Sequence, residues 1–236
     1  FVEATPSSTP TVLDVGGPVL TAPVVEPIFF ASDDTTIQSE AEDFLAQLST
    51  SSYWTTISAD YGVGALTVDP PIISSDTPPT SDTDLDSWLA GHFDGSNGWP
   101  AAPDPQTIYA VFLPSGVVLQ TSFGTSCQAF GGYHDETTDG SGNSVVYALL
   151  PRCGGIESLT SATSHELIEA STDPHVETDL AYYVVDDDHY VWSYMPGGEV
   201  GDMCEYLDTA NQQLVGTYYV QRIWSNSAAA AGHDPC

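Results

Sequence analysis

The segment from residue 156 to residue 175 constrains this chain more than any other. Its apolar positions predict a helix over residues 156–172, which ends before Pro174 because proline cannot continue the helical hydrogen-bond ladder. His165 and Glu169 stand four residues apart and therefore share one face of that helix, with Glu166 beside them. A cation held by this imidazole and this carboxylate would lie next to Glu166, which could act as a base on a water molecule. The side chains expected to face the core are Leu159, Thr163, Leu167 and Ala170.

The charge balance excludes two classes of partner. Against 33 Asp and Glu residues the chain carries only two strong bases, Arg152 and Arg222, and its formal net charge is −31. Such a field repels nucleic acid and anionic membranes, so we expect neither as a partner. No apolar run approaches the roughly 18 residues that a membrane span needs. We expect divalent cations or mildly acidic pH to stabilise the fold by relieving this repulsion; the same surface would also suit an acidic or salty habitat.

The four cysteines favour disulfides. They form an even set without CxxC spacing, which argues against a zinc knuckle or a redox pair. Together with a lysine-free surface rich in Ser and Thr, they indicate a protein secreted into an oxidising, extracellular environment. The sequence does not determine the pairing. The pairing we favour joins Cys127 to Cys153, before the motif helix, and Cys204 to Cys236, at the C-terminus.

Helical and strand patterns interleave before the motif. We expect residues 1–20, rich in Pro, Ser, Thr and Gly, to form an extended arm, and residues 21–236 to form a single domain and a monomer. Helices are predicted at 35–48, capped by Thr35 or Thr36, and at 53–61 and 85–93. Strands are predicted at 24–31, 108–113, 116–121, 144–150, 190–194 and 215–224. This order predicts an α/β or α+β fold with a mixed sheet packed on helices and an irregular C-terminal third.

Several segments together resemble one family. They are Gly16–Leu20, Ser52–Trp54, Tyr61–Gly64, Gly131–His134, Ser164–Pro174, Glu199–Cys204 and Val220–Asn226. As a set they are similar to a group of secreted bacterial proteins of about this size and, more distantly, to the plant EXORDIUM (phosphate-induced) cell-wall proteins. The resemblance spans nearly the whole chain. It implies export and a single domain, and it does not itself supply an enzymatic activity.

A second resemblance concerns the motif. The residues His165-Glu166-Leu167-Ile168-Glu169 resemble the HExxH motif of zinc peptidases, with Glu169 in place of the second histidine (HExxE). The layout, a strand, a long helix, further strands and then the motif helix, is similar to that of the zincin metallopeptidases. This resemblance implies a zincin-like domain over residues 21–236, bound zinc and a polypeptide substrate.

A zinc ion needs about three protein ligands, and the motif supplies two of them. In a metzincin-like layout the third follows the helix, where His175 has the right offset and Asp173 lies in the same bend. In a gluzincin-like layout it is a later carboxylate, Glu199 or Asp202. We favour Glu199, because its segment belongs to the family resemblance, with His175 next.

Other polar side chains have weaker signals. Asp186, Asp187 and Asp188 would suit calcium, although they are also typical of a solvated turn. Oxyanion donors could come from a set that nothing in the sequence separates: Tyr183, His189, Tyr190 and Tyr194. Three histidines have no informative spacing, and we expect them to be structural or exposed: His92, His134 and His233.

These patterns predict a secreted, zinc-dependent, endopeptidase-like hydrolase with Glu166 as the general base. The leading alternative is a non-catalytic extracellular or cell-wall-associated protein in which the metal site is structural. A carboxylate-pair hydrolase using Glu166 with Glu169 or Asp173 is a third reading, but neighbouring helix positions can hardly flank one scissile bond. The simplest alternative is an ordinary ion pair between His165 and Glu169, with Asp173 capping local backbone.

Overall fold

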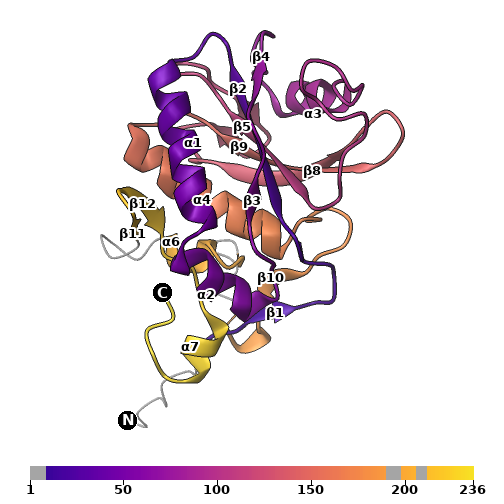
Figure 1. Ribbon diagram of the computed structural model, residues 1–236. Coiled ribbons are helices and arrows are strands. Elements are labelled where there is room, and N and C mark those ends of the chain that lie inside the picture. Colours follow the sequence, from indigo (N-terminus) through magenta and orange to yellow (C-terminus); the bar gives the residue numbers. More distant parts are fainter. Residues whose placement is uncertain (1–8, 190–197, 206–211) are drawn as a thin grey trace.

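A mixed sheet forms the centre of the structure, a computed structural model that describes residues 9–189, 198–205 and 212–236 (Figure 1). Its strands lie in the order β3-β2-β5-β9-β8, and β4 also pairs with β2. Strands β2, β5 and β9 are parallel, whereas β8 is an edge strand antiparallel to β9. The bounds are β2 (Val24–Phe30), β3 (Thr67–Val68), β4 (Ile72–Ser74), β5 (Thr107–Phe112), β8 (Tyr133–Thr138) and β9 (Ser144–Leu150). The fold is therefore mixed α+β, as the sequence predicts.

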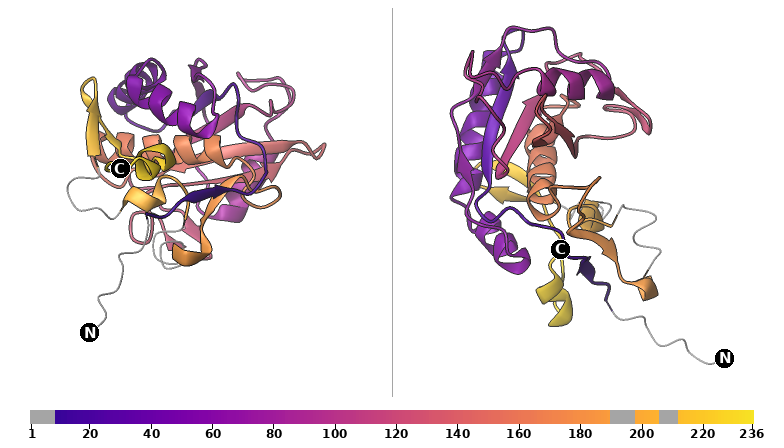
Figure 2. Two further views of the ribbon diagram at one scale, coloured as in Figure 1. Left: turned by 90° about the horizontal axis from the view of Figure 1, so that it is seen from below. Right: turned by 90° about the vertical axis from the view of Figure 1, so that its right-hand side faces the viewer.

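Helices cover both faces of this sheet. One face packs against α1 (Thr35–Ser49), α2 (Ser52–Tyr61) and α4 (Ile156–Thr172), and the other against α3 (Asp82–Ala90). Neighbouring strand residues point to opposite faces. Phe29 accordingly stacks on Phe112 in the first core, while Phe30 contacts Trp88 of α3 in the second. The layers are seen edge-on in Figure 2.

Smaller elements complete the described chain. Strand β1 (Val12–Asp14) pairs with β10 (Tyr182–Val185), so the start of the described chain lies beside a late segment (Figure 2). Two further pairs are β6 (Gln120–Thr121) with β7 (Gly124–Thr125), and β11 (Gln212–Val215) with β12 (Tyr218–Gln221). The short helices are η1 (Asp187–His189), α6 (Asp202–Glu205) and α7 (Asn226–Ala230). Within the described ranges, no helix is both long and apolar enough to span a membrane.

Local capping explains where the helices begin and end. The N-cap of α1 is Asp34, whose carboxylate accepts a hydrogen bond from the backbone N–H of Thr36 at 2.8 Å. The predicted cap, Thr35 or Thr36, was therefore wrong, because the carboxylate one residue earlier already satisfies a free N–H of the first turn. Helix α2 ends at Gly62, whose φ of 77° is the left-handed conformation that glycine adopts without a Cβ clash.

Helix α4 has the predicted bounds and is buried along almost its whole length. Its hydroxyl side chains bond to carbonyls of their own helix: Thr163 to Leu159, and Ser171 to Leu167. These bonds allow a polar helix to be buried, because an unpaired buried hydroxyl would cost free energy. The predicted core positions are buried, and so are His165, Glu166 and Glu169.

Two predicted strands differ from the structure: a turn with Gly216 at a φ of 58° interrupts the one at 215–224, so that only β12 (Tyr218–Gln221) lies within it, and the other is at 116–121. Residues 116–121 form a loop apart from the short β6, since Gly116 has a φ of 82° and Val117 closes a turn on Pro114. Strand β8 was missed because most of its residues are polar, as is common in an edge strand. The predicted strand at 190–194 lies outside the described residues.

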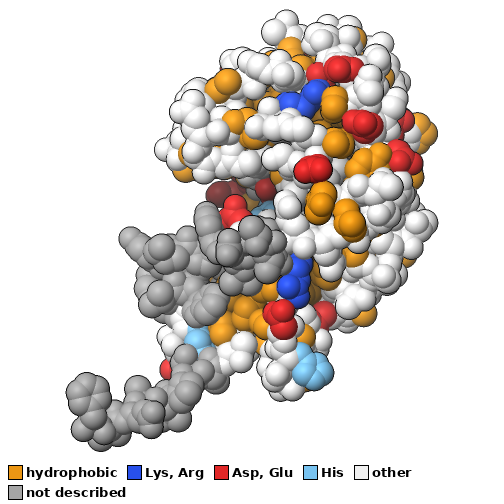
Figure 3. Space-filling view, turned by 90° about the vertical axis from the view of Figure 1, so that its left-hand side faces the viewer, with side chains coloured by type: hydrophobic (Ala, Val, Ile, Leu, Met, Phe, Trp, Pro, Cys, Tyr) orange, Lys and Arg blue, Asp and Glu red, His pale blue; other side chains and the backbone are white. Residues whose placement is uncertain are grey.

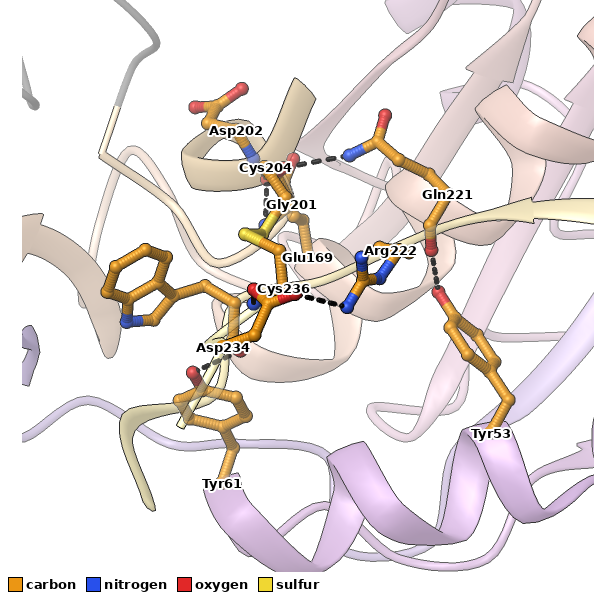
Figure 4. Close-up of a disulfide and its surroundings, with 11 residues drawn as sticks. Tyr53, Tyr61, Glu169, Gly201, Asp202, Cys204, Gln221, Arg222, Asp234 and Cys236 are labelled. Atoms are coloured by element: carbon orange, nitrogen blue, oxygen red, sulfur yellow. Dashed lines mark hydrogen bonds and ion pairs between the residues drawn. A yellow bond between two sulfur atoms is a disulfide. The ribbon is translucent and has the colours of Figure 1, made fainter. Parts of the chain in front are cut away.

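The favoured disulfide pairing is confirmed. Cys127 is bonded to Cys153, and Cys204 to Cys236. The first bridge joins the loop before β8 to the segment before α4. The second joins α6 to the last residue of the chain (Figure 4).

Candidate metal centre

The motif residues of α4 meet the segment at residues 199–202. The Nε2 atom of His165 lies 2.9 Å from Oε2 of Glu169, one helical turn later. The other oxygen of Glu169 accepts hydrogen bonds from the backbone N–H groups of Gly201 and Asp202, both at 2.9 Å. Glu169 is thereby fixed by two backbone donors, with its second oxygen directed at the imidazole.

Gly201 makes this approach possible. A Cβ atom at this position would stand 2.7 Å from Oε1 of Glu169 and 3.0 Å from Cε1 of His165. Any side chain would therefore push the backbone donors away from the carboxylate. The requirement is for space, which explains a glycine that the sequence pattern alone did not single out.

Asp202 brings a third ligand group to the motif pair. Its Oδ1 lies 3.8 Å from Nε2 of His165. His165, Glu169 and Asp202 each offer one atom, and these atoms all lie within 4.8 Å of one another. Asp202 was one of the four candidates for a third ligand, and it is the one that the structure groups with the motif pair.

A second group of possible ligands lies deeper. It consists of His134 at the start of β8, Glu169 and Glu199, whose candidate atoms are also within 4.8 Å of one another. Nε2 of His134 lies 3.2 Å from Oε1 of Glu199, and its Nδ1 lies 3.8 Å from Oε2 of Glu169. Glu199, our favoured third ligand, is thus grouped with His134. His134 was predicted to be structural or exposed, and its spacing carries no sign of a ligand role; it is buried, in the Gly131–His134 segment of the family resemblance.

Glu166 lies between the two groups of possible metal ligands and a cleft. Its Oε2 is 3.7 Å from Nδ1 of His134, and its side chain packs against Gly132. The cleft has a volume of about 420 Å³. Its lining includes Gly131, Gly132, His165, Glu166, Asp202 and Gln221. On the face shown in Figure 3, acidic side chains and a histidine side chain lie in a recess. Of the candidate site residues, His165, Glu166 and Asp202 line this cleft.

The site is dominated by buried negative charge. Burial, followed by the charge of Glu169, raises the pKa of Asp202 to about 9. Burial alone would lower the pKa of His165, but the carboxylates of Glu169 and Glu166 outweigh it and raise this pKa well above its ordinary range. The pKa of His134 is raised in the same way, chiefly by Glu199. Without a metal the site therefore retains protons, which a bound cation would displace.

Hydrogen bonds from β12 hold α6 and α4 in place (Figure 4). The side-chain amide of Gln221 donates to the carbonyl of Gly201 at 2.8 Å, and its backbone N–H donates to the hydroxyl of Ser164 at 2.9 Å. Its own carbonyl accepts from the hydroxyl of Tyr53 on α2 at 2.7 Å. With the Cys204–Cys236 disulfide, these bonds position Asp202.

The two candidates just after α4 have other partners. Nδ1 of His175 lies 2.9 Å from Oε2 of Glu136 on β8, and Thr178 donates to the same carboxylate. Asp173 closes α4, and its Oδ1 accepts a hydrogen bond from the N–H of Ala181 at 2.7 Å. Both residues hold the loop after α4 in place through these hydrogen bonds. Neither belongs to a possible ligand group among the described residues.

The remaining described candidates are Tyr183 and His189, and they have different surroundings. The carboxylates of Glu199 and Asp202, after burial, raise the pKa of Tyr183 on β10, so this hydroxyl shares the electrostatic environment of the site. His189 pairs instead with Asp186, Nδ1 to Oδ1 at 2.6 Å, within the turn that contains η1. Tyr190 and Tyr194 lie outside the described residues.

Comparison of this chain with protein-family models, with curated proteins and with solved structures found no match. Only the site itself therefore indicates a function.

Proposed function

We propose that this protein is a secreted, zinc-dependent endopeptidase-like hydrolase whose cation is held by His165, Glu169 and Asp202. The observation that carries the proposal is the grouping of these three side chains beside a cleft that Glu166 also lines. An ordinary ion pair between His165 and Glu169 would not require a further, partly buried carboxylate beside the same imidazole.

The separations of the ligand atoms suit zinc. A tetrahedral zinc ion with bonds of about 2.1 Å holds its ligand atoms about 3.4 Å apart. The separations from Nε2 of His165 are 2.9 Å to Glu169 and 3.8 Å to Asp202, which bracket that value. One imidazole and two carboxylates also leave a coordination position for water or substrate. When bound, zinc would polarise a substrate carbonyl and lower the pKa of a coordinated water.

The residues around this group would divide the work. Glu166, which lines the cleft and is not needed as a ligand, would take a proton from the attacking water and return it to the leaving amine. Glu169 would hold its position through its bonds to Gly201 and Asp202. Of the candidate oxyanion donors among the described residues, Tyr183 remains the one to test, because His189 pairs with Asp186.

A polypeptide substrate is supported by the edge strand. β8 pairs with β9 on one side, and no described strand pairs with its other side. The residues just before it, Gly131 and Gly132, line the cleft. An extended peptide can add to such an edge through main-chain hydrogen bonds. The order strand, long helix, strands and motif helix supports a zincin-like fold, and the two disulfides support an extracellular setting.

The test is cleavage of an unfolded protein, such as reduced and alkylated casein, by zinc-loaded protein. Glu166→Gln should lower the rate by about 100- to 10,000-fold, the usual contribution of a general base, with metal content unchanged. Glu157→Gln is the matched control, because Glu157 is exposed at the start of the same helix. A chelator should abolish cleavage and zinc should restore it.

The rival readings predict different results. A structural site would bind zinc tightly with no cleavage of any unfolded substrate. A carboxylate-pair hydrolase would be indifferent to chelator. Either result would overturn the proposed function.

A further inference from the structure

His134 is a buried side chain of the site that the proposed function does not use. It is 8% exposed, and its Nε2 makes no hydrogen bond. Oε1 of Glu199 is likewise buried without a hydrogen bond, although the two atoms are 3.2 Å apart. Two facing atoms that form an ion pair without hydrogen-bond geometry can instead both bind a cation placed between them.

The spacing of these atoms is suitable for a cation. The separation of 3.2 Å between His134 and Glu199 is close to the roughly 3.4 Å edge of a zinc tetrahedron. Glu169 supplies the third atom, since one of its carboxylate oxygens lies within 4.8 Å of the candidate atoms of both His134 and Glu199. One carboxylate is thus shared by both groups of possible ligands.

The charge of the site also suits more than one cation. Glu166, Glu169, Glu199 and Asp202 surround the two imidazoles. The chain has no lysine, and Arg152 and Arg222 form ion pairs with Asp33 and Asp234. One divalent cation would leave two negative charges on four ionised carboxylates, whereas two divalent cations would balance all four.

We infer that the site binds two divalent cations, the second held by His134, Glu169 and Glu199, with Glu169 bridging the pair. This inference rests on the proposed function, because it adds a cation to the same site. In paired sites the ions lie about 3.5–4 Å apart and act on the attacking and leaving groups together. The second cation would lie deeper than the first, since His134 and Glu199 do not line the cleft.

The experiment is metal stoichiometry. Protein stripped with chelator is dialysed against zinc, desalted and analysed by inductively coupled plasma mass spectrometry, with circular dichroism to check the fold. We expect two equivalents in the wild type and one in His134→Gln, Glu199→Gln or Asp202→Asn. His92→Gln is the control and should keep two, because His92 pairs with Asp76 away from the site.

The outcomes separate this inference from the proposed function. One equivalent that is lost in Asp202→Asn and kept in His134→Gln overturns the second cation and leaves the proposed function standing. One equivalent lost in His134→Gln but kept in Asp202→Asn, or none at all, overturns both. Two equivalents without cleavage support the paired site and overturn the hydrolase.

If the variants do not fold, cobalt titration of the wild type decides the question. Absorbance that rises to two equivalents, with an electron paramagnetic resonance signal weakened by spin coupling, supports the pair. A titration complete at one equivalent contradicts it.

Discussion

Replacing Gly132 by alanine should displace the proposed general base without removing the metal. A Cβ atom at this position would stand 2.7 Å from Oε1 of Glu166, 3.0 Å from its Cγ and 3.2 Å from its Cδ. Ordinary contact begins near 3.4 Å, so the carboxylate must move by about 0.7 Å. Because the carboxylate of Glu166 is the far end of a flexible side chain, it will move before the backbone at Gly132 does.

A shift of this size is large for catalysis and small for stability. Misplacing a catalytic group by about 1 Å can cost 100-fold in rate, so we expect kcat to fall by about 10- to 100-fold. Gly131→Ala is the matched control, one residue away on the same cleft wall, because its Cβ would meet nothing within 4 Å. Its kcat should remain that of the wild type.

The assay is cleavage of an unfolded protein by zinc-loaded variants, with metal content and melting temperature measured on the same samples. The expected pattern is a lowered kcat for Gly132→Ala with unchanged zinc and a similar melting temperature. If Gly132→Ala cleaves at the wild-type rate, Glu166 is not the base. If the variant instead loses its zinc, Glu166 holds metal, and the roles assigned to the site are wrong.

Three further predictions concern the stability and composition of the site. Burial raises the pKa of Asp202 to about 9, so the metal-free folded protein holds a proton that the unfolded chain releases. The melting temperature of the metal-free protein should therefore fall as pH rises from about 4 to 9, and bound zinc should make this pH dependence weaker. Replacing Cys204 and Cys236 by serine removes a disulfide that spans 32 residues. Denaturant titration should show that the free energy of unfolding falls by about 4 kcal/mol, and zinc binding should weaken. His175→Ala should keep its zinc by elemental analysis, because His175 pairs with Glu136; loss of zinc would make it a ligand.

Much of the fold could be predicted because its central elements have strong local signals. The apolar runs of β2, β5 and β9 and the periodicity of α1 and α4 agree with the structure closely. The stop at Pro174 also holds, since α4 ends at Thr172. Strand β8 could not be found in the same way. It is an edge strand of mainly polar residues, so its hydrophobic pattern is weak.

The residues of the candidate site also differ in how far they could be predicted from the sequence. His165, Glu166 and Glu169 could be placed together from sequence, because helix geometry relates positions four residues apart. His134 and Asp202 come from β8 and α6, and only the tertiary fold brings them to α4. The choice among Glu199, Asp202 and other later residues depended on such contacts, which no local pattern encodes.

Anomalous X-ray scattering from crystals of the zinc-loaded protein tests the central claim most directly. Data collected on both sides of the zinc absorption edge should show a peak about 2.0–2.2 Å from Nε2 of His165 and from carboxylate oxygens of Glu169 and Asp202. Full zinc loading in the crystal with no peak among these three side chains would contradict the account.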